Sequence, residues 1–434
     1  MRGRLVKRLD STDVDFQSHF DQLLKRGKMD IDEVSLLVKS ILDSIKKEGN
    51  SAIKRDIAKF DHWDVVEDSM LEIKTDTMKQ AYDQLDDSLK NALHLAYDRI
   101  ENYHQKQMPK SWLDYADDGS VLGQKVSAVD RAGLYIPGGK AAYPSSLLMN
   151  AIPAIVAGVE EIVVCTPTPN NEINELLLAA MHLCGIKKAF KVGGASAIGA
   201  MAYGTQSIPK VDVITGPGNI FVATAKKLVY GEVNIDMIAG PSEIGIIADE
   251  SGDPKLLAMD LLSQAEHDEM ASSLLITTSR KIADETEKEI EIALKTLSRE
   301  EIARKSIENR GAIIKAGDLD EAAYLMNQIA PEHLELMIEN PFTLLPKIKH
   351  AGAIFMGRYT PEAIGDYIAG PNHTLPTGGT AKFYSPLNVE NFLKKSSIIS
   401  MSKESIDSLG EACALLAQTE GLQAHQKSVQ MRLD

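Results

Sequence analysis

One local pattern repeats along the middle of the chain: a short run of β-forming residues, a glycine or proline, and then apolar residues at helical spacing. The runs and the residues that close them are 132–136 before Pro137-Gly138-Gly139, 161–165 before Thr166-Pro167, 189–192 before Gly193-Gly194, and 211–215 before Gly216-Pro217-Gly218. Strands that are joined through helices pair in parallel, because each connection has to return to the same end of the sheet. The pattern therefore predicts a mainly parallel sheet with helices on both faces.

A second series of such runs follows at 244–248, 274–278, 312–315 and 353–356. Two α/β lobes are therefore expected, with ligands at the carboxyl ends of their strands. The chain before the first series predicts helices instead, because its apolar residues recur at helical spacing. We expect an N-terminal arm at 1–30, a helical region at 31–125, a first lobe at 126–243, a second lobe at 244–380 and a C-terminal extension at 381–434.

The composition argues against two classes of partner. Lys plus Arg number 47 and Asp plus Glu 62, which gives a formal net charge of −15 at pH 7, and no long Lys/Arg cluster stands out. This acidic balance would repel a phosphate backbone, so we expect no nucleic-acid binding. No run approaches the roughly 18 consecutive apolar residues that a membrane helix needs, so we expect no membrane span.

The cysteines and the first residues bear on the compartment. Cys165, Cys184 and Cys413 form no CxxC pair and are too few for a disulfide framework. The basic opening of the chain meets Asp10 and Asp13 without an apolar core, unlike a secretory signal or a transit peptide. We therefore expect a cytoplasmic protein. A nucleophilic role for Cys165 at a strand end is disfavoured, because no flanking residue would lower the pKa of its thiol.

The segment Gly216-Pro217-Gly218-Asn219 follows a predicted strand and opens a predicted helix, and Asp236 lies 18 residues beyond Gly218. This is the setting of a dinucleotide-binding fingerprint, but Phe221 stands where that fingerprint has a third glycine or an alanine. Each glycine loop taken alone could simply end a buried strand. Several together indicate backbone N–H groups and helix starts arranged around an anion such as pyrophosphate.

Gln264 and His267 stand three residues apart in a helical stretch and therefore share a face. Such a pair is often solvated surface, but it can hold a divalent metal if other segments of the chain supply further ligands. Asp366, His373 and His425 are the candidates for those ligands. Nitrogen and oxygen donors of this kind suit zinc, manganese or cobalt.

Glu332 and His333 follow Pro331 directly and place a carboxylate beside an imidazole. A neutral histidine is the usual base for an alcohol proton near neutral pH, and a neighbouring glutamate could activate water. The alternative is a helix start, with Pro331 at its first position and Glu332 favoured by the helix dipole. The local sequence alone leaves both interpretations open.

Five separated motifs, taken together, resemble the histidinol dehydrogenase family, and the match runs from about residue 30 to the end of the chain. The motifs are Gly216-Pro217-Gly218-Asn219, Ile235-Asp236-Met237-Ile238-Ala239-Gly240-Pro241-Ser242-Glu243, Gln264-Ala265-Glu266-His267-Asp268, Ala330-Pro331-Glu332-His333-Leu334-Glu335 and Gly370-Pro371-Asn372-His373-Thr374-Leu375-Pro376-Thr377. Five motifs in this order are far more specific than any one of them. The resemblance implies a zinc- and NAD-dependent oxidoreductase of histidine biosynthesis, which converts L-histidinol to L-histidine through L-histidinaldehyde and consumes two NAD.

The functional residues of that family carry over to matching positions here. The resemblance implies that the metal, which binds and orients the substrate, is held by Gln264, His267, Asp366 and His425. It implies that His333 is the base of the alcohol step and that Glu332 activates water on the aldehyde. Substrate contacts are implied for the metal ligands and His333, and also for Ser242, His373 and Glu420.

Tyr135 and Asn219 match NAD contacts of the family, whereas the usual Gly-Gly-Ala-Gln of a third contact reads Gly193-Gly194-Ala195-Ser196 here. The resemblance further implies two incomplete Rossmann-like lobes. Residues 126–243 would bind NAD, residues 244–380 would carry the metal and the catalytic residues, and the helical region would pack on this catalytic lobe. The family also implies a homodimer with shared active sites, in which the extension is exchanged and Glu420 and His425 complete the partner's site.

Three alternatives to this function differ in their chemistry. A related metal-dependent dehydrogenase could oxidise another small alcohol, such as a sulfonate diol, but Ser242, Glu420 and all four metal positions favour histidinol. A metallohydrolase would use Glu332 to drive a zinc-bound water. A non-catalytic scaffold would bind metal without turnover.

Overall fold

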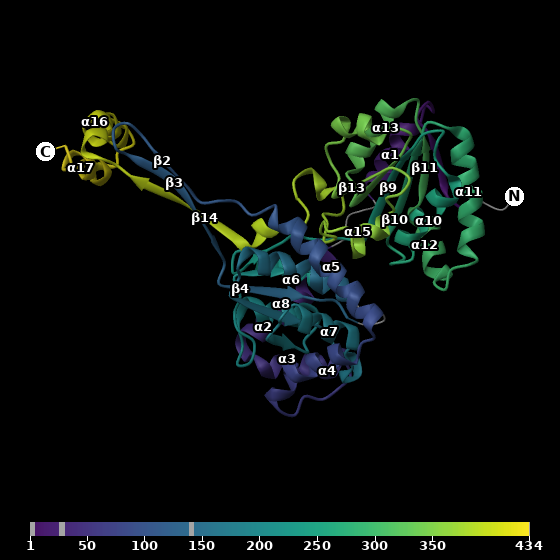
Figure 1. Ribbon diagram of the computed structural model, residues 1–434, viewed down its shortest axis with the longest axis horizontal. Helices are drawn as coiled ribbons and strands as arrows, with labels where there is room; N and C mark the ends of the chain where they lie inside the picture. The colour runs from purple at the N-terminus through teal and green to yellow at the C-terminus, as the bar shows by residue number, and fades with distance from the viewer. Residues whose placement is uncertain (1–4, 26–30, 139–142, 434) are drawn as a thin grey trace.

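The computed structural model describes residues 5–25, 31–138 and 143–433, and Figure 1 shows them as two α/β lobes and a long arm. Within each lobe every strand pairs in parallel with its neighbours, and helices cover both faces of the sheet. This confirms the predicted fold class of two incomplete Rossmann-like lobes, with a helical N-terminal region and a C-terminal extension. Among the described residues, no helix is long and apolar enough to cross a membrane.

The first lobe is built on a five-stranded sheet with the order β6-β5-β4-β7-β8. Its strands are β4 (Arg131–Tyr135), β5 (Glu161–Cys165), β6 (Lys188–Phe190), β7 (Val213–Thr215) and β8 (Asn234–Ile235). Its helices are α2 (Ile31–Glu48), α3 (Asn50–Phe60), α4 (Thr75–Gln84), α5 (Asp87–Gln105), α6 (Pro144–Ala157), α7 (Glu175–Leu183), α8 (Gly194–Tyr203) and α9 (Ile220–Val229). Helices α4–α7 supply the core on one face of the sheet, and α2, α3, α8 and α9 supply it on the other. The predicted helical region therefore packs on this lobe rather than on the catalytic lobe.

The second lobe is built on a six-stranded sheet with the order β1-β11-β10-β9-β12-β13. Its strands are β1 (Lys7–Asp10), β9 (Glu243–Ala248), β10 (Ser272–Thr277), β11 (Ala312–Lys315), β12 (His333–Met337) and β13 (Ala353–Met356). Its helices are α1 (Phe16–Leu24), α10 (Pro254–Ala265), α11 (Arg280–Leu294), α12 (Glu300–Arg310), α13 (Leu319–Ile329), α14 (Pro341–Leu344) and α15 (Glu362–Tyr367). Every residue of β9 and β12 is buried, including the polar Glu243, His333 and Glu335. The predicted N-terminal arm contributes β1 to the edge of this sheet.

The arm is an antiparallel sheet that leads to a helical hairpin. It consists of β2 (Trp112–Tyr115), β3 (Val121–Ala128), β14 (Leu393–Ser400), α16 (Lys403–Thr419) and α17 (Gln423–Gln430). Strand β3 lies between β14 and β2, so residues before the first lobe join the C-terminal extension in one sheet. In Figure 1 the arm extends away from both lobes and carries the C-terminus at its tip. Large apolar side chains stay exposed along it, including Trp112, Tyr115, Ile399, Leu415 and Leu416.

Single turns of 3-10 helix complete the fold, at Asp68–Leu71, Pro169–Asn171, Leu345–Lys347, Thr380–Lys382 and Val389–Phe392. Several α-helices begin at the side chains that the sequence offers as caps. Asn174 accepts hydrogen bonds from the first N–H groups of α7, and Asn219 does so for α9. Both helices therefore begin directly after a loop that ends a strand of the first sheet.

Candidate active site

Glu332 and His333 lie at the amino end of β12, between β9 and β13. Helix α13 ends at Ile329, and Ala330 then takes a left-handed conformation with φ of 50°. The interpretation of Pro331 as a helix start is therefore wrong, because the chain enters a buried strand there. In this lobe the candidate residues lie at the amino ends of β9 and β12, and not at the carboxyl ends where ligands are expected.

The main chain of Glu243 fixes both candidate catalytic side chains. Its N–H donates to Oε2 of Glu332 at 2.9 Å, and its carbonyl oxygen lies 3.1 Å from Nδ1 of His333. These contacts are possible because β9 and β12 are neighbours, with His333 in register with Ile244. Burial raises the pKa of Glu332 to about 8. The carboxyl group is thus held in place, and its proton is exchangeable near neutral pH.

Two acidic groups lie at the other edge of the His333 ring. Nε2 lies 3.5 Å from Oδ1 of Asp366 and 4.0 Å from Oε1 of Glu362, and it has no partner in hydrogen-bond geometry among the described residues. Burial disfavours a charged imidazole, but the negative charges of Glu362, Glu332 and Asp366 outweigh it and raise the pKa of His333 to about 10. The ring is therefore protonated on both nitrogens unless another cation joins the cluster that His333, Glu362 and Asp366 form.

Helix α15 brings Glu362 and Asp366 to the same place, one turn apart. The pKa of Asp366 is lowered because His333 and His373 offset the cost of its burial, whereas burial raises the pKa of Glu362 to about 7. His333, Glu362 and Asp366 each offer one ligand atom, and these atoms lie within 4.8 Å of one another. The sequence analysis missed Glu362, although its spacing of four residues from Asp366 on a helix could have indicated it.

Gln264 closes the cluster from the last turn of α10, where it is fully buried. With its amide nitrogen toward Glu362, it donates to Oε1 and Oε2 at 2.5 and 3.1 Å, and its oxygen accepts from the N–H of Glu243 at 3.1 Å. His267 follows two residues after the end of this helix, and Asp366 and His333 are among the charges that act on its ring. The structure therefore brings Gln264 and Asp366 to one cluster, and His267 lies near enough for the charge of Asp366 to act on its ring.

His425 and Glu420 do not reach this cluster within one chain. Both are exposed, on α17 and at the end of α16, and Figure 1 shows these helices at the tip of the arm, remote from β9 and β13, between which β12 lies. Ser242 is half-buried directly before β9, next to the cluster in sequence and in space. Of the residues predicted to bind metal or substrate, the two in the arm are thus remote from the cluster of their own chain.

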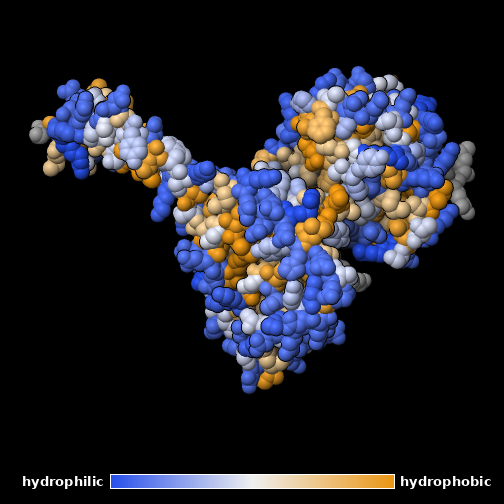
Figure 2. All heavy atoms as spheres, viewed as in Figure 1, coloured by the Kyte–Doolittle hydropathy of each residue, from blue (hydrophilic) through white to orange (hydrophobic). Residues whose placement is uncertain are grey.

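Two contacts tie the cluster to the first lobe. His373 lies with Nδ1 2.9 Å from the carbonyl oxygen of Asp366 and with Nε2 3.5 Å from Oγ of Ser146 in α6. Arg99 of α5 donates to the carbonyl oxygens of Ile368 and Ala369 at 2.7 and 3.1 Å, which holds the loop after α15. Figure 2 shows a hollow between the two lobes in this view. The loop between α15 and His373 is therefore anchored from both lobes.

The predicted NAD contacts line a cavity of about 400 Å³ in the first lobe. Tyr135 ends β4, and its hydroxyl accepts from the N–H of Gly194 at the start of α8 at 3.3 Å. Asn219 caps α9, with Oδ1 accepting from Phe221 and Val222 at 3.1 and 3.2 Å. Two helix N-termini thus meet at the carboxyl ends of the strands, an arrangement that favours an anion.

Asp236, the acidic residue of the glycine-loop pattern, is not placed to bind a ribose. Asp236 is buried, pairs with Lys226, and accepts from the N–H of Gly216 at 2.8 Å. Gly216 has φ of 118°, and a Cβ there would lie 2.0 Å from the carbonyl oxygen of Tyr135. Asp236 therefore shapes the turn before Asn219 and does not line the cavity.

Cys165 is fully buried as expected, and burial raises the pKa of its thiol.

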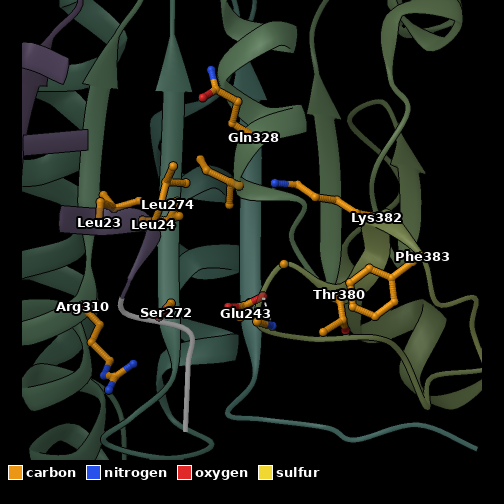
Figure 3. Close-up of a pocket in the computed structure, with 13 residues that line it drawn as sticks. Leu23, Leu24, Glu243, Ser272, Leu274, Arg310, Gln328, Thr380, Lys382 and Phe383 are labelled. Carbon is orange, nitrogen blue, oxygen red and sulfur yellow. Dashed lines mark hydrogen bonds between the residues drawn. The ribbon is translucent and has the colours of Figure 1, made fainter. Parts of the chain in front are cut away.

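A second cavity, of about 450 Å³, lies beside the cluster and contains none of the predicted site residues. Figure 3 shows Glu243 between Lys382 and Phe383 on one side and Leu23 and Leu24 on the other. The Glu243 carboxylate accepts from the N–H of Gly378 at 3.1 Å, and burial raises its pKa to about 7. Glu243, also missed by the sequence analysis, thus serves the cluster with its main chain and this cavity with its side chain.

Comparisons with known proteins agree with this geometry. A profile of the histidinol dehydrogenase family matches residues 24–433. The histidinol dehydrogenases of Sulfurimonas denitrificans and Wolinella succinogenes are 66% and 64% identical over 418 and 430 residues, which cover 96% and 99% of this chain and 97% and 100% of theirs. The crystal structure of histidinol dehydrogenase from Elizabethkingia anophelis superposes with a TM-score of 0.93 at 34% identity, covering 100% of this chain and 99% of that one. The chain therefore belongs to the histidinol dehydrogenase family.

Proposed function

We propose that the protein oxidises L-histidinol to L-histidine through L-histidinaldehyde, with two NAD as hydride acceptors. Membership of the family supports the substrate, and the two lobes supply separate places for the two halves of the chemistry. The NAD cavity lies at the carboxyl ends of the first sheet, and the polar cluster lies at the amino end of β12. In this proposal the substrate binds at the cluster, and its carbinol carbon faces the cofactor across the hollow.

The hydrogen bonding of His333 carries the proposal. A carbonyl oxygen can only accept, so the contact of Nδ1 with the carbonyl of Glu243 places a proton on Nδ1. Nε2 is then the atom that can take a proton, and it faces the cluster without a hydrogen-bond partner among the described residues. A base oriented in this way can remove the hydroxyl proton of histidinol as hydride leaves the carbon. His333 is thus positioned by the main chain of β9 for the alcohol step.

Glu332 is assigned to the aldehyde step. The aldehyde has to gain water before it can give up a second hydride, and a buried carboxylate with a pKa of about 8 is a competent base for that water. Its Oε2 is held by the N–H of Glu243, which leaves Oε1 for the water. One main-chain unit, that of Glu243, thereby orients the bases of both oxidations.

The residues of the cluster fit a divalent cation such as zinc. Turning the Gln264 amide so that its oxygen faces Glu362 brings only acceptors together, and a bound cation would stabilise that arrangement. In this proposal Gln264, His267 and Asp366 hold the cation, together with His425 of a second copy. When bound, zinc supplies positive charge that anchors the substrate nitrogens without exchanging electrons. Its charge would also lower the pKa of His333 and free Nε2 to act as the base.

The arm provides the remaining residues in a homodimer. Glu420 and His425 lie far from the cluster of their own chain, and apolar side chains along the arm are exposed. We infer that the arm of each subunit reaches the other subunit and completes its site. Mixing inactive Asp366→Asn and His425→Ala subunits should then restore about a quarter of the wild-type activity, because half of the dimers carry one intact site. Failure to recover activity from exchanged subunits would contradict the shared site.

The stoichiometry of NADH tests the function itself. Purified protein with limiting L-histidinol and excess NAD should form two NADH per histidinol and release L-histidine. L-histidinaldehyde supplied directly should yield one NADH. One NADH per histidinol with free aldehyde as the product, or no NADH at all, would contradict the proposal.

A further inference from the structure

We propose that Asp56 selects the cofactor, by binding the adenosine ribose of NAD and excluding the 2′-phosphate of NADP. This inference rests on the proposed function, because it takes the first-lobe cavity as the NAD site. The cavity has two chemically distinct ends, and Asp56 lies with Ser196 among its lining residues. Asp56 belongs to α3, outside all the motifs on which the family resemblance rests.

One end of the cavity suits the pyrophosphate. Helix α8 begins there at Gly194 without a side-chain cap, and α9 begins there behind Asn219. The N–H groups of two helix starts favour negative charge at that end. Another part of the lining is apolar and suits a base, since α2 and α3 contribute Leu37, Ile41, Ile57 and Phe60 to it. The adenosine ribose joins the pyrophosphate to the base, so in this cavity it has to lie next to the pyrophosphate end.

Asp56 lies beside the first turn of α8, next to the pyrophosphate end, with one carboxylate oxygen hydrogen-bonded and one free. Oγ of Ser196 donates to Oδ2 of Asp56 at 2.5 Å, whereas Oδ1 has no hydrogen-bond partner among the residues that the structure describes. Asp56 is half-buried, and burial raises its pKa despite the hydrogen bond from Ser196. A fixed carboxylate with a free oxygen can accept hydrogen bonds from ribose hydroxyls, as the acidic residue of a dinucleotide-binding fold does.

Ser196 is the residue that orients the Asp56 carboxylate. The family resemblance leads us to expect glutamine at this position, whereas the chain has Ser196, whose short hydroxyl donates to Asp56. A glutamine amide could contact the ribose directly. We therefore assign this contact to Asp56, which Ser196 orients.

The negative charge of Asp56 and Asp61 in the cavity lining explains the exclusion of NADP. Asp61 lines the same cavity, is buried, and accepts from the N–H of Thr168 at 3.3 Å. No lysine or arginine among the described residues lines the cavity. The cations of α3 do not line the cavity, since Lys54 and Arg55 pair with Asp68 and Glu48 and Lys59 lies over the ring of Phe60. A 2′-phosphate placed beside two carboxylates in a partly buried cavity would be strongly repelled.

Binding of NAD and NADP to the full-length protein tests the inference by isothermal titration calorimetry, without histidinol. The wild type should bind NAD more tightly than NADP by on the order of 100-fold. Asp56→Asn and Asp56→Ser should weaken NAD binding by about tenfold and reduce the preference to a few-fold, because both remove the charge. Asp43→Asn is the matched control, since it removes an exposed carboxylate from α2 outside the cavity and should leave both affinities unchanged.

Two outcomes overturn different statements. Folded Asp56 variants, checked by circular dichroism, that keep the wild-type preference for NAD would refute the role of Asp56 and leave the proposed function intact. A wild-type protein that binds neither cofactor and forms no NADH from histidinol would refute the proposed function. Ser196→Ala gives an independent check, because it should weaken NAD binding less than the Asp56 variants do while the protein stays folded.

Discussion

Lys226 and Asp236 form an ion pair in the interior of the first lobe, and together they bind both main-chain polar groups of Gly216. The Lys226 ammonium donates to the carbonyl oxygen at 2.9 Å, and the Asp236 carboxylate accepts from the N–H at 2.8 Å. The two side chains are 2% and 0% exposed, so water cannot replace either partner. The turn that leads to Asn219 is therefore fixed by a buried charge pair.

Removing one member of this pair should destabilise the protein. Lys226→Met leaves Asp236 buried and unpaired, which we expect to lower the free energy of unfolding by about 3–5 kcal/mol. Urea denaturation measures the change. Lys227→Met is the control, because Lys227 is exposed one position along the same helix and should change stability little. Equal effects of the two substitutions would show that the pair does not hold the turn.

The base of the alcohol step can be tested by substitution of His333. His333→Asn should lower histidinol oxidation by on the order of 100-fold or more, because an amide nitrogen is not basic enough to take the hydroxyl proton. Pre-steady-state NADH formation isolates the first oxidation. His62→Asn, at an exposed position with φ of 60° that asparagine tolerates, is the control. A first turnover of normal rate in His333→Asn would remove the residue from this role.

The water-activating role of Glu332 predicts an unequal loss between the two oxidations. Glu332→Gln keeps an oxygen for the N–H of Glu243 but removes the basic carboxylate. Oxidation of supplied histidinaldehyde should therefore fall much further than the first hydride transfer from histidinol. Losses of the same size in both steps would argue for a structural role.

The charge of His333 predicts how the metal-free protein responds to pH. Although burial opposes it, the surrounding carboxylates raise the pKa of His333 from 6.5 to about 10, so its contribution to stability is fully present below pH 6.5 and is lost as pH rises through about 10. Glu332 acts in the same direction, since burial raises its pKa to about 8. The free energy of unfolding should thus fall across this window, and less steeply in His333→Gln. Identical pH profiles for the two proteins would contradict the assignment.

The regular part of the fold could be predicted from local sequence. Runs such as 161–165 are closed by glycine or proline and followed by helical spacing, and this texture was sufficient to predict two parallel sheets. Strand β1 escaped prediction because Lys7–Asp10 is a short, charged segment whose partner, β11, lies some 300 residues away in sequence. The sheet of the arm escaped for the same reason, since β3 pairs with β14 from the far end of the chain.

The site could be predicted only in part. Motifs identified Gln264, Glu332 and His333, but local sequence cannot show that Glu243 binds both catalytic side chains through its main chain. Asp236 shows the converse difficulty. Its spacing from the glycine loop suggests a ribose contact, whereas tertiary packing places it in a buried ion pair. Pairing across the sheet and burial decide these roles, and neither is encoded in short-range spacing.

Removal of metal tests the central claim most directly. Protein that is exhaustively treated with chelator, and shown by circular dichroism to remain folded, should no longer form NADH from histidinol and NAD. Activity should return as zinc is added, and it should saturate at one ion per subunit. Undiminished turnover of the folded, metal-free protein would contradict the account of a cation held among Gln264, His267 and Asp366.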